Sequence, residues 1–106
     1  MTILRIFPQD FKILREGQEE FLLLDVREPW EIEQASFKEA LCIPLAFLQD
    51  KASSLPNSKL IITVCHHGVR SLKAALILNQ MGKKALSLEG GIEAYAQSVD
   101  PTMPRY

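Results

Sequence analysis

The fold of this chain is decided by residues 59–71, which have the sequence KLIITVCHHGVRS. Residues 59–64 form an apolar, β-branched segment that predicts a strand buried on both faces, as is typical of parallel sheets. Residues 69–81 have a wide apolar stripe that predicts a helix, with Leu72, Ala75 and Leu76 on its buried face, Ile77 and Leu78 beside them, and Gly82 as its C-terminal cap. A strand that leads through a tight loop into a helix is a building unit of parallel α/β folds.

Short apolar segments alternate with amphipathic segments on both sides of this unit. The expected strands are residues 3–7, 21–26, 40–43, 59–64 and 85–88. The expected helices are residues 8–16, 28–35, 45–51, 69–81 and 92–97. Because no hairpin signal joins the strands, the pattern predicts one α/β domain over residues 1–106, with a five-stranded parallel sheet and helices on both faces.

Composition excludes several classes of protein. The chain has 106 residues, with 12 Lys and Arg against 13 Asp and Glu, so there is no global basic field to hold a nucleic acid. The longest apolar runs, such as residues 21–24, are far shorter than the about 20 residues that span a bilayer, and the N-terminal segment lacks the pattern of a signal peptide. We therefore expect no nucleic-acid or membrane partner. Two cysteines cannot form a disulfide framework, which favours a reducing, cytoplasmic location.

Residues 65–71 place a cysteine where a ligand site is expected. In open parallel sheets, ligands bind at the carboxyl ends of strands, often against a helix N-terminus. Loop N–H groups, the dipole of the following helix and the charge of Arg70 all favour the thiolate form of Cys65. Gly68 allows the loop a positive φ. A thiolate in an anion-binding loop is a nucleophile suited to an electrophile that is itself anionic.

This loop and several further segments resemble the rhodanese sulfurtransferases. The loop has the pattern Cys-x-x-Gly-x-Arg-Ser, and the other matching segments follow in the family's order. These are residues 23–31 (LLDVREPWE), 40–45 (ALCIPL), 86–95 (LSLEGGIEAY) and the tail 99–106 (VDPTMPRY). The resemblance covers nearly the whole chain and implies a rhodanese-like fold.

The resemblance also implies roles for individual residues. Cys65 would take the outer sulfur of thiosulfate or a similar small anionic donor and carry it as a persulfide, until a thiol, a protein or cyanide accepts it. The residues that would bind the donor and the persulfide are His66, His67, Gly68, Val69, Arg70 and Ser71. Asp25 and Arg27 would organise the structure beside the site. No cofactor and no metal are implied.

Two other functions fit the same fold. A rhodanese-like domain without turnover would be a binding or regulatory module, although the intact loop around Cys65 favours an enzyme. An arsenate reductase or a phosphatase of this fold would have a loop that is one residue longer, whereas only four residues separate Cys65 from Arg70 here.

Four more residues allow alternative interpretations. Cys42 lies among apolar residues of a short predicted strand, so we expect it to pack in the core; a role as a resolving thiol would require proximity to Cys65. The spacing of His66 and His67 does not fit a zinc site, so they either line the mouth and add positive charge as the pH falls, or are merely exposed loop residues. We expect Trp30 to pack rather than to bind.

The sequence departs from the family pattern in two places. Residues 36–40 are SFKEA, where family members commonly have His-Ile-Pro-Gly-Ala, so the turn before the third strand must be built differently. Tyr95 stands where the family usually has Trp.

Overall fold

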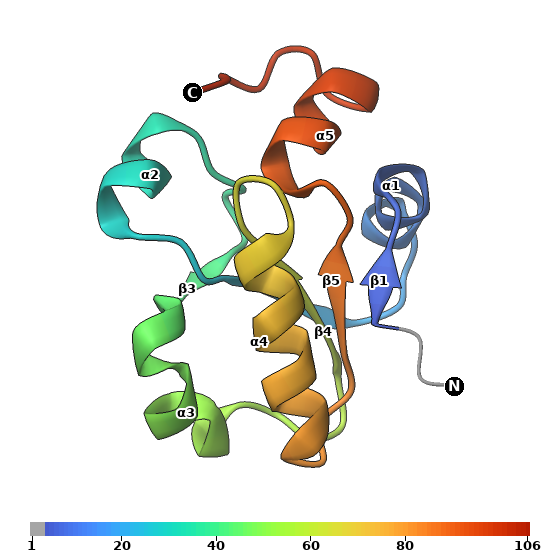
Figure 1. Ribbon diagram of the computed structural model, residues 1–106. Coiled ribbons are helices and arrows are strands. Elements are labelled where there is room, and N and C mark those ends of the chain that lie inside the picture. The colour runs from blue at the N-terminus through green and yellow to red at the C-terminus, as the bar shows by residue number, and fades with distance from the viewer. Residues whose placement is uncertain (1–3) are drawn as a thin grey trace.

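The computed structural model describes residues 4–106 (Figure 1). Within this range the strands are β1 (Arg5–Ile6), β2 (Phe21–Asp25), β3 (Leu41–Cys42), β4 (Leu60–Val64) and β5 (Ala85–Leu88). The α-helices are α1 (Pro8–Glu16), α2 (Pro29–Gln34), α3 (Leu48–Lys51), α4 (Val69–Gln80) and α5 (Gly91–Ser98). The short 3-10 helices η1 (Leu45–Phe47) and η2 (Ala52–Ser54) flank α3.

The five strands form one parallel sheet, in the order β1-β5-β4-β2-β3. This confirms the predicted α/β fold with a five-stranded parallel sheet. Strand β4 lies at the centre, where Leu60–Val64 pair with Phe21–Asp25 of β2. Because all strands run the same way, their carboxyl ends meet at one edge of the sheet, where the segments after β2, β4 and β5 lie together (Figure 1).

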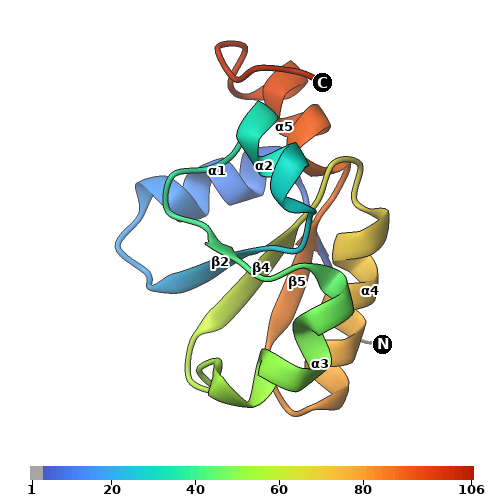
Figure 2. The ribbon, with the colours of Figure 1, turned by 90° about the vertical axis from the view of Figure 1, so that its left-hand side faces the viewer.

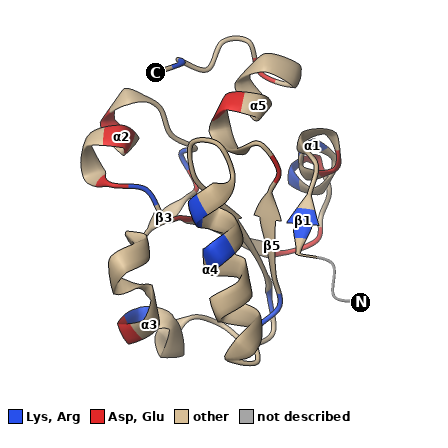
Figure 3. Ribbon diagram, in the orientation of Figure 1, with Lys and Arg blue, Asp and Glu red and all other residues tan. Residues whose placement is uncertain are grey.

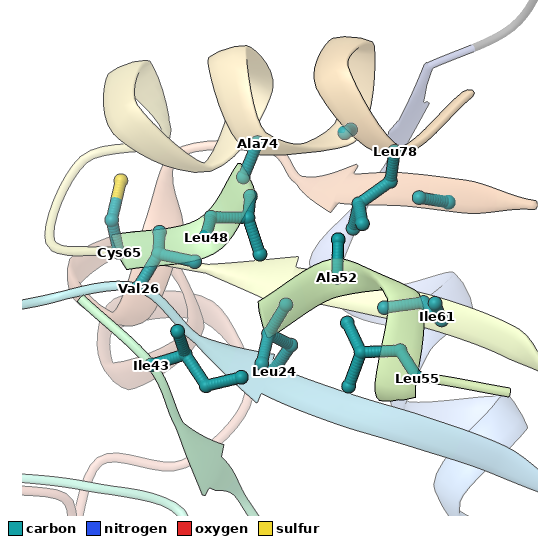
Figure 4. Packing of buried hydrophobic residues seen from close by; sticks show 12 residues of the cluster. Leu24, Val26, Ile43, Leu48, Ala52, Leu55, Ile61, Cys65, Ala74 and Leu78 are labelled. Atoms are coloured by element: carbon teal, nitrogen blue, oxygen red, sulfur yellow. The ribbon is translucent and has the colours of Figure 1, made fainter. Parts of the chain in front are cut away.

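Two apolar cores lie on opposite faces of the sheet, because successive side chains of a strand point to opposite sides. Leu24 and Ile61 belong to the core beneath α3 and α4 (Figure 4), whereas Leu23 and Ile62 belong to the core that faces α1 and α5. Figure 2 shows α4 and α1 on either side of the sheet. None of the helices in residues 4–106 is long and apolar enough to cross a membrane.

The buried face of α4 differs from the predicted one. Its buried residues are Ser71, Ala74, Ala75 and Leu78, whereas Leu76 is 47% exposed and Leu72 is only partly buried. Positions 71, 74, 75 and 78 follow the spacing of a single helix face, and that face is turned to the sheet. The prediction was therefore right for Ala75 and wrong for Leu76. Gly82 has a φ of 84° just after the helix, as expected of a residue at its C-terminal end.

Several element boundaries also differ from prediction. The expected helix of residues 45–51 is split between η1 and α3, and the expected strand of residues 40–43 contains only Leu41–Cys42. Of the expected first strand, Arg5–Ile6 are extended, and Ile3 lies outside the described residues. Short elements at the margin of the sheet make few ladder bonds, so their limits depend on tertiary packing more than on local pattern.

The two departures from the family pattern meet in one aromatic cluster. The turn before β3 is closed by the Ala40 N–H, which donates to the Phe37 carbonyl at 3.2 Å. The Phe37 ring is buried and packs edge-on against Tyr95, with ring centroids 5.0 Å apart. The Tyr95 hydroxyl accepts a hydrogen bond from Arg15 at 2.8 Å, and the Arg15 side chain also pairs with Glu39 of the turn. Arg15 of α1 thus contacts both places where the sequence departs from the family pattern, through Tyr95 and through Glu39 of the turn.

Candidate active site

Cys65 lies at the end of the central strand, where the chain leaves β4 and turns into α4 (Figure 1). It is the first residue after Val64, and its side chain is only 1% exposed. Figure 4 shows Cys65 at the edge of the core, beside Val26 and near the first turn of α4. Cys65, the nucleophile expected from the sequence, therefore lies at the edge of the sheet where the carboxyl ends of the strands meet.

Hydrogen-bond donors converge on the cysteine sulfur. The backbone N–H groups of Gly68 and Ser71 donate to Cys65 Sγ at 3.1 and 3.3 Å. Ser71 Oγ lies 3.4 Å from the same sulfur and 2.6 Å from Ser87 Oγ on β5. With these amides and the N-terminus of α4 directed at it, the sulfur occupies a position that stabilises negative charge. Ser87 was not predicted, because only the pairing of β5 with β4 brings it here.

Glycines allow the loop to keep this shape. Gly68 has a φ of 95°, and a Cβ added to it would lie 3.0 Å from the Gly90 nitrogen. Gly91 has a φ of 65°, and its Cβ would overlap the carbonyl oxygens of Cys65 and His66. The same two oxygens accept hydrogen bonds from the first turn of α5, at 2.9 Å from the Ile92 nitrogen and 3.1 Å from the Glu93 nitrogen. The first turn of α5 therefore packs against the loop and holds its backbone through these two hydrogen bonds.

Arg70 is engaged by a carboxylate that was not predicted. Its guanidinium forms a two-pronged ion pair with Glu31 of α2, with Nη1–Oε1 at 2.5 Å and Nη2–Oε2 at 2.7 Å. The sequence predicted that Arg70 favours the thiolate and helps to bind the donor, but it did not predict a carboxylate that pairs with this charge. The hydrogen bonds from Arg70 lower the pKa of Glu31 to about 2, and the bond to Glu31 raises the pKa of Arg70.

Glu31 is held in place by its own surroundings. It is 3% exposed, and its carboxylate also accepts hydrogen bonds from the Glu28 N–H at 3.1 Å and the Tyr106 hydroxyl at 3.0 Å. Glu28 is the N-cap of α2 and Glu31 is its third residue, so the two form a capping box. Two sequence signals included Glu31, the capping pattern and the family-matching segment of residues 23–31, and neither indicated a role at the site.

Asp25 and Arg27 form a fully buried ion pair beside the loop. Arg27 Nη2 donates to Asp25 Oδ2 at 2.7 Å, and both side chains are inaccessible to solvent. Arg27 also donates to the Ala35 carbonyl at the end of α2 and to the Tyr106 hydroxyl, at 2.7 and 2.8 Å. The pair thus ties β2 to α2 and to the C-terminal tail.

Aromatic rings stack along the loop. The His66 ring lies between His67 and Tyr106, with ring centroids 4.0 and 3.9 Å away. Burial, and then the neighbouring His67, lower the pKa of His66. Within residues 4–106, His66 Nε2 is buried without a hydrogen-bond partner. His66 therefore gains its positive charge at a lower pH than a free imidazole does. His67 is exposed, as the second of the two interpretations expected.

Two further residues are more exposed than predicted. Trp30 is 61% exposed and contacts Tyr106 only edge-on, at a centroid distance of 6.3 Å. Cys42 was expected in the core, and this was wrong, since it lies exposed on the two-residue edge strand β3. Partial burial and nearby Asp25 raise the pKa of the Cys42 thiol. Val69, at the start of α4, is also exposed.

Cys42 and Cys65 are both free thiols; Cys42 lies on β3, and Cys65 directly follows β4. Cys42 pairs with Asp25 of β2, and Asp25 pairs with Val64 on its other side, so β2 separates the two cysteines. Two strand spacings amount to about 9.5 Å, which is beyond the reach of a disulfide without backbone movement. In the part of the chain described, no cluster of three or more His, Cys, Asp or Glu side chains could hold a metal ion.

Known proteins share the sequence pattern of most of this chain. Residues 8–98 match the family model of the rhodanese-like domain. The putative sulfurtransferase YtwF of Bacillus subtilis is 30% identical, with 95% of this chain and 98% of that protein covered. A sulfurtransferase of Allochromatium vinosum is 36% identical over 74% of this chain and 75% of its own. The adenylyltransferase and sulfurtransferase MOCS3-2 of Zea mays is 33% identical, but the chain spans only 23% of its length.

Solved structures show the same architecture. A rhodanese-related protein from Thermoplasma volcanium superposes with a TM-score of 0.83 at 30% identity, covering 91% of this chain and 93% of that one. A rhodanese-like domain protein from Staphylococcus aureus has a TM-score of 0.84 at 25% identity, covering 98% and 99%.

Proposed function

We propose that this chain, which belongs to the rhodanese-like domain family, is a sulfurtransferase that carries a sulfane sulfur as a persulfide on Cys65. The family and the sulfurtransferases among its relatives support sulfurtransferase activity in general. The observation that supports the chemistry in this chain is the convergence of the Gly68 and Ser71 N–H groups on Cys65 Sγ.

In the first step, the Cys65 thiolate attacks the outer sulfur of a donor such as thiosulfate. A bond forms between Sγ and that sulfur, the sulfur–sulfur bond of the donor breaks, and sulfite leaves with the bonding electron pair. The loop amides hold the negative charge that passes from Sγ to the outer sulfur of the persulfide. The step uses only the donor and the thiolate, so the electrons balance.

In the second step, an acceptor such as a thiolate or cyanide attacks the outer sulfur of the persulfide. The new bond forms as the persulfide bond breaks, and Cys65 leaves as the thiolate with which the cycle began. Dividing the transfer into two displacements is covalent catalysis, in which the enzyme group is both nucleophile and leaving group.

The persulfide is tested by intact-mass measurement of the protein after incubation with a sulfane donor. We expect a gain equal to one sulfur atom, which is lost again on addition of cyanide, with thiocyanate as the product. Cys65→Ser should abolish the gain, whereas Cys42→Ser, the matched change at the exposed thiol, should retain it. If Cys65 took up no sulfur from any donor, a binding or regulatory module would be the better interpretation.

A further inference from the structure

We propose that Glu31 is a specificity-determining residue that selects sulfane donors of low negative charge over the thiosulfate dianion, by neutralising Arg70 beside the cysteine loop. This inference rests on the proposed sulfur transfer and concerns which donors the same site accepts. Donors of the favoured class are monoanionic thiosulfonates and protonated persulfides of thiols. Thiosulfate, with two negative charges, is the disfavoured one.

The first support is the geometry of the ion pair. Both terminal nitrogens of the Arg70 fork are paired with the two oxygens of Glu31, so the end of the guanidinium is already engaged by a carboxylate and its charge is compensated there. The Arg70 side chain is 35% exposed, whereas that of Glu31 is 4% exposed. The carboxylate is therefore the fixed, buried partner, and an incoming dianion would have to displace it.

The second support is that Glu31 stays ionised in this setting. Its carboxylate accepts four hydrogen bonds, two from Arg70 and one each from the Glu28 N–H and the Tyr106 hydroxyl. Such bonds stabilise the charged form, and the pKa of Glu31 is lowered accordingly to about 2. The compensating charge is thus present at every pH at which sulfur transfer would be measured.

The third support is that the other arginines around the loop are also paired. Arg27 is paired with Asp25, and Arg105 with Glu93, whose backbone nitrogen contacts the loop at His66. Figure 3 shows acidic positions on α2 and α5 on either side of the basic start of α4. Lys73, one turn beyond Arg70, is exposed, so water and salt screen its charge.

The pairing of Arg70 with Glu31 therefore weakens the binding of a dianionic donor more than that of a monoanionic one. The loop amides can hold one negative charge on the transferred sulfur, for either kind of donor. A second charge on the donor needs a free cation nearby, and Glu31 pairs with Arg70, the arginine of the loop itself. Replacing Glu31 by Gln keeps the shape and one hydrogen-bond acceptor for Arg70, but frees the guanidinium charge.

The experiment compares two donors that transfer sulfur by the same displacement, thiosulfate and methanethiosulfonate. The measured quantity is the ratio of their kcat/KM values with cyanide as acceptor. In Glu31→Gln we expect this ratio to shift roughly tenfold toward thiosulfate, and the thiosulfate value to become more sensitive to salt. Glu39→Gln is the matched control, because it removes a carboxylate from the Arg15–Glu39 pair, which lies outside the loop. It should leave the ratio unchanged.

A second variant tests the same idea in the opposite direction. Arg70→Gln leaves the Glu31 carboxylate without its cation, so the ratio should shift toward methanethiosulfonate. An unchanged ratio in either folded variant would overturn the role of Glu31, even if both donors still load Cys65. Failure of both donors to load the wild-type protein would instead count against the proposed function, so the two failures are distinguishable. Melting curves establish which variants fold.

Discussion

Arg70 is neutralised by Glu31 in the resting site, so removing its side chain does more than delete a cation. Arg70→Ala leaves the buried Glu31 carboxylate unpaired next to the loop, where it repels an anionic donor. We expect kcat/KM for thiosulfate to fall by about 10²-fold, and by less in Arg70→Lys, which keeps the charge but loses the planar fork. Steady-state sulfur transfer measures both, with Cys65→Ser as the zero-activity baseline. Full turnover by Arg70→Ala would mean that the loop amides alone hold the sulfur.

The lowered pKa of Glu31 also predicts how stability depends on pH. In the fold this pKa is about 2, below its ordinary value of 4.5. Such a group stabilises the fold fully above its ordinary pKa, and this contribution is lost as the pH falls from about 4.5 toward 2. The difference in unfolding free energy between wild type and Glu31→Gln should therefore shrink across that range, as followed by urea unfolding. The same pH dependence for Glu39→Gln would contradict a special role of Glu31.

Gly91 faces the loop where a side chain has no space. Gly91→Ala adds a Cβ that overlaps the carbonyls of Cys65 and His66, at a φ of 65°. We expect destabilisation beyond the about 1–3 kcal/mol cost of a strained backbone position, together with loss of persulfide loading.

Gly82→Ala is the control for backbone strain at Gly91. Gly82 has a φ of 84°, but a Cβ there meets nothing within 4 Å. Gly82→Ala should therefore lower the unfolding free energy by only about 1–2 kcal/mol and leave persulfide loading of Cys65 intact. Equal losses of stability in the two variants, by urea unfolding, would show that overlap with the loop is unimportant.

At the scale of elements, the C-terminal tail is fastened to α2 and to the loop through Tyr106. Its hydroxyl accepts a bond from Arg27 and donates one to Glu31, while its ring stacks on His66. Tyr106→Phe keeps the ring and removes both bonds, so we expect a loss of about 1–3 kcal/mol in unfolding free energy with persulfide loading retained. Tyr106→Ala, which also uncovers His66, should be less stable than Tyr106→Phe. Equal stability of the two variants would rule out a contribution from the ring.

The elements that the sequence predicted best are those with strong local patterns. Strand β4, the Cys65 loop and α4 were placed within a residue or two, because a continuous apolar run and a helical stripe leave little choice. The edge strand β3 and the 3-10 helices around α3 were not resolved by local pattern. Cys42 was misjudged for the same reason, since an apolar neighbourhood in sequence does not reveal that a strand lies at the edge of its sheet.

From the residues alone, the site was predictable only where its parts are adjacent in sequence; the family resemblance added the Asp25–Arg27 pair beside it. Residues 65–71 were identified as a unit because the loop is local. Glu31, Ser87 and Tyr106 were missed, because each reaches the loop from another part of the chain. Their contacts depend on the strand order and on how α2 and the tail pack over the carboxyl edge of the sheet. The apolar periodicity of the sequence predicts the elements but not these arrangements.

At the scale of the whole molecule, one parallel sheet brings the separate parts of the site together. The carboxyl ends of β2, β4 and β5 deliver the Asp25–Arg27 pair, Cys65 and the Gly90–Gly91 turn to the same edge. Helix α4 contributes to both the site and the core. The Ser71 N–H in its first turn donates to the Cys65 sulfur, and the residues along its buried face pack on the core beneath it (Figure 4). Packing of α4 on the sheet is therefore expected to govern the stability of the molecule.

This packing is tested by two leucines of α4 that face opposite ways. Leu78 is fully buried in the core, so Leu78→Ala should lower the unfolding free energy by about 2–5 kcal/mol, through lost contacts and a residual cavity. Leu76 is largely exposed, so Leu76→Ala should change it by no more than about 0.5 kcal/mol. Urea unfolding measures both, and similar losses would show that the buried face of α4 is misassigned. Under native conditions both variants should still load Cys65, because neither side chain touches the loop amides that hold the sulfur.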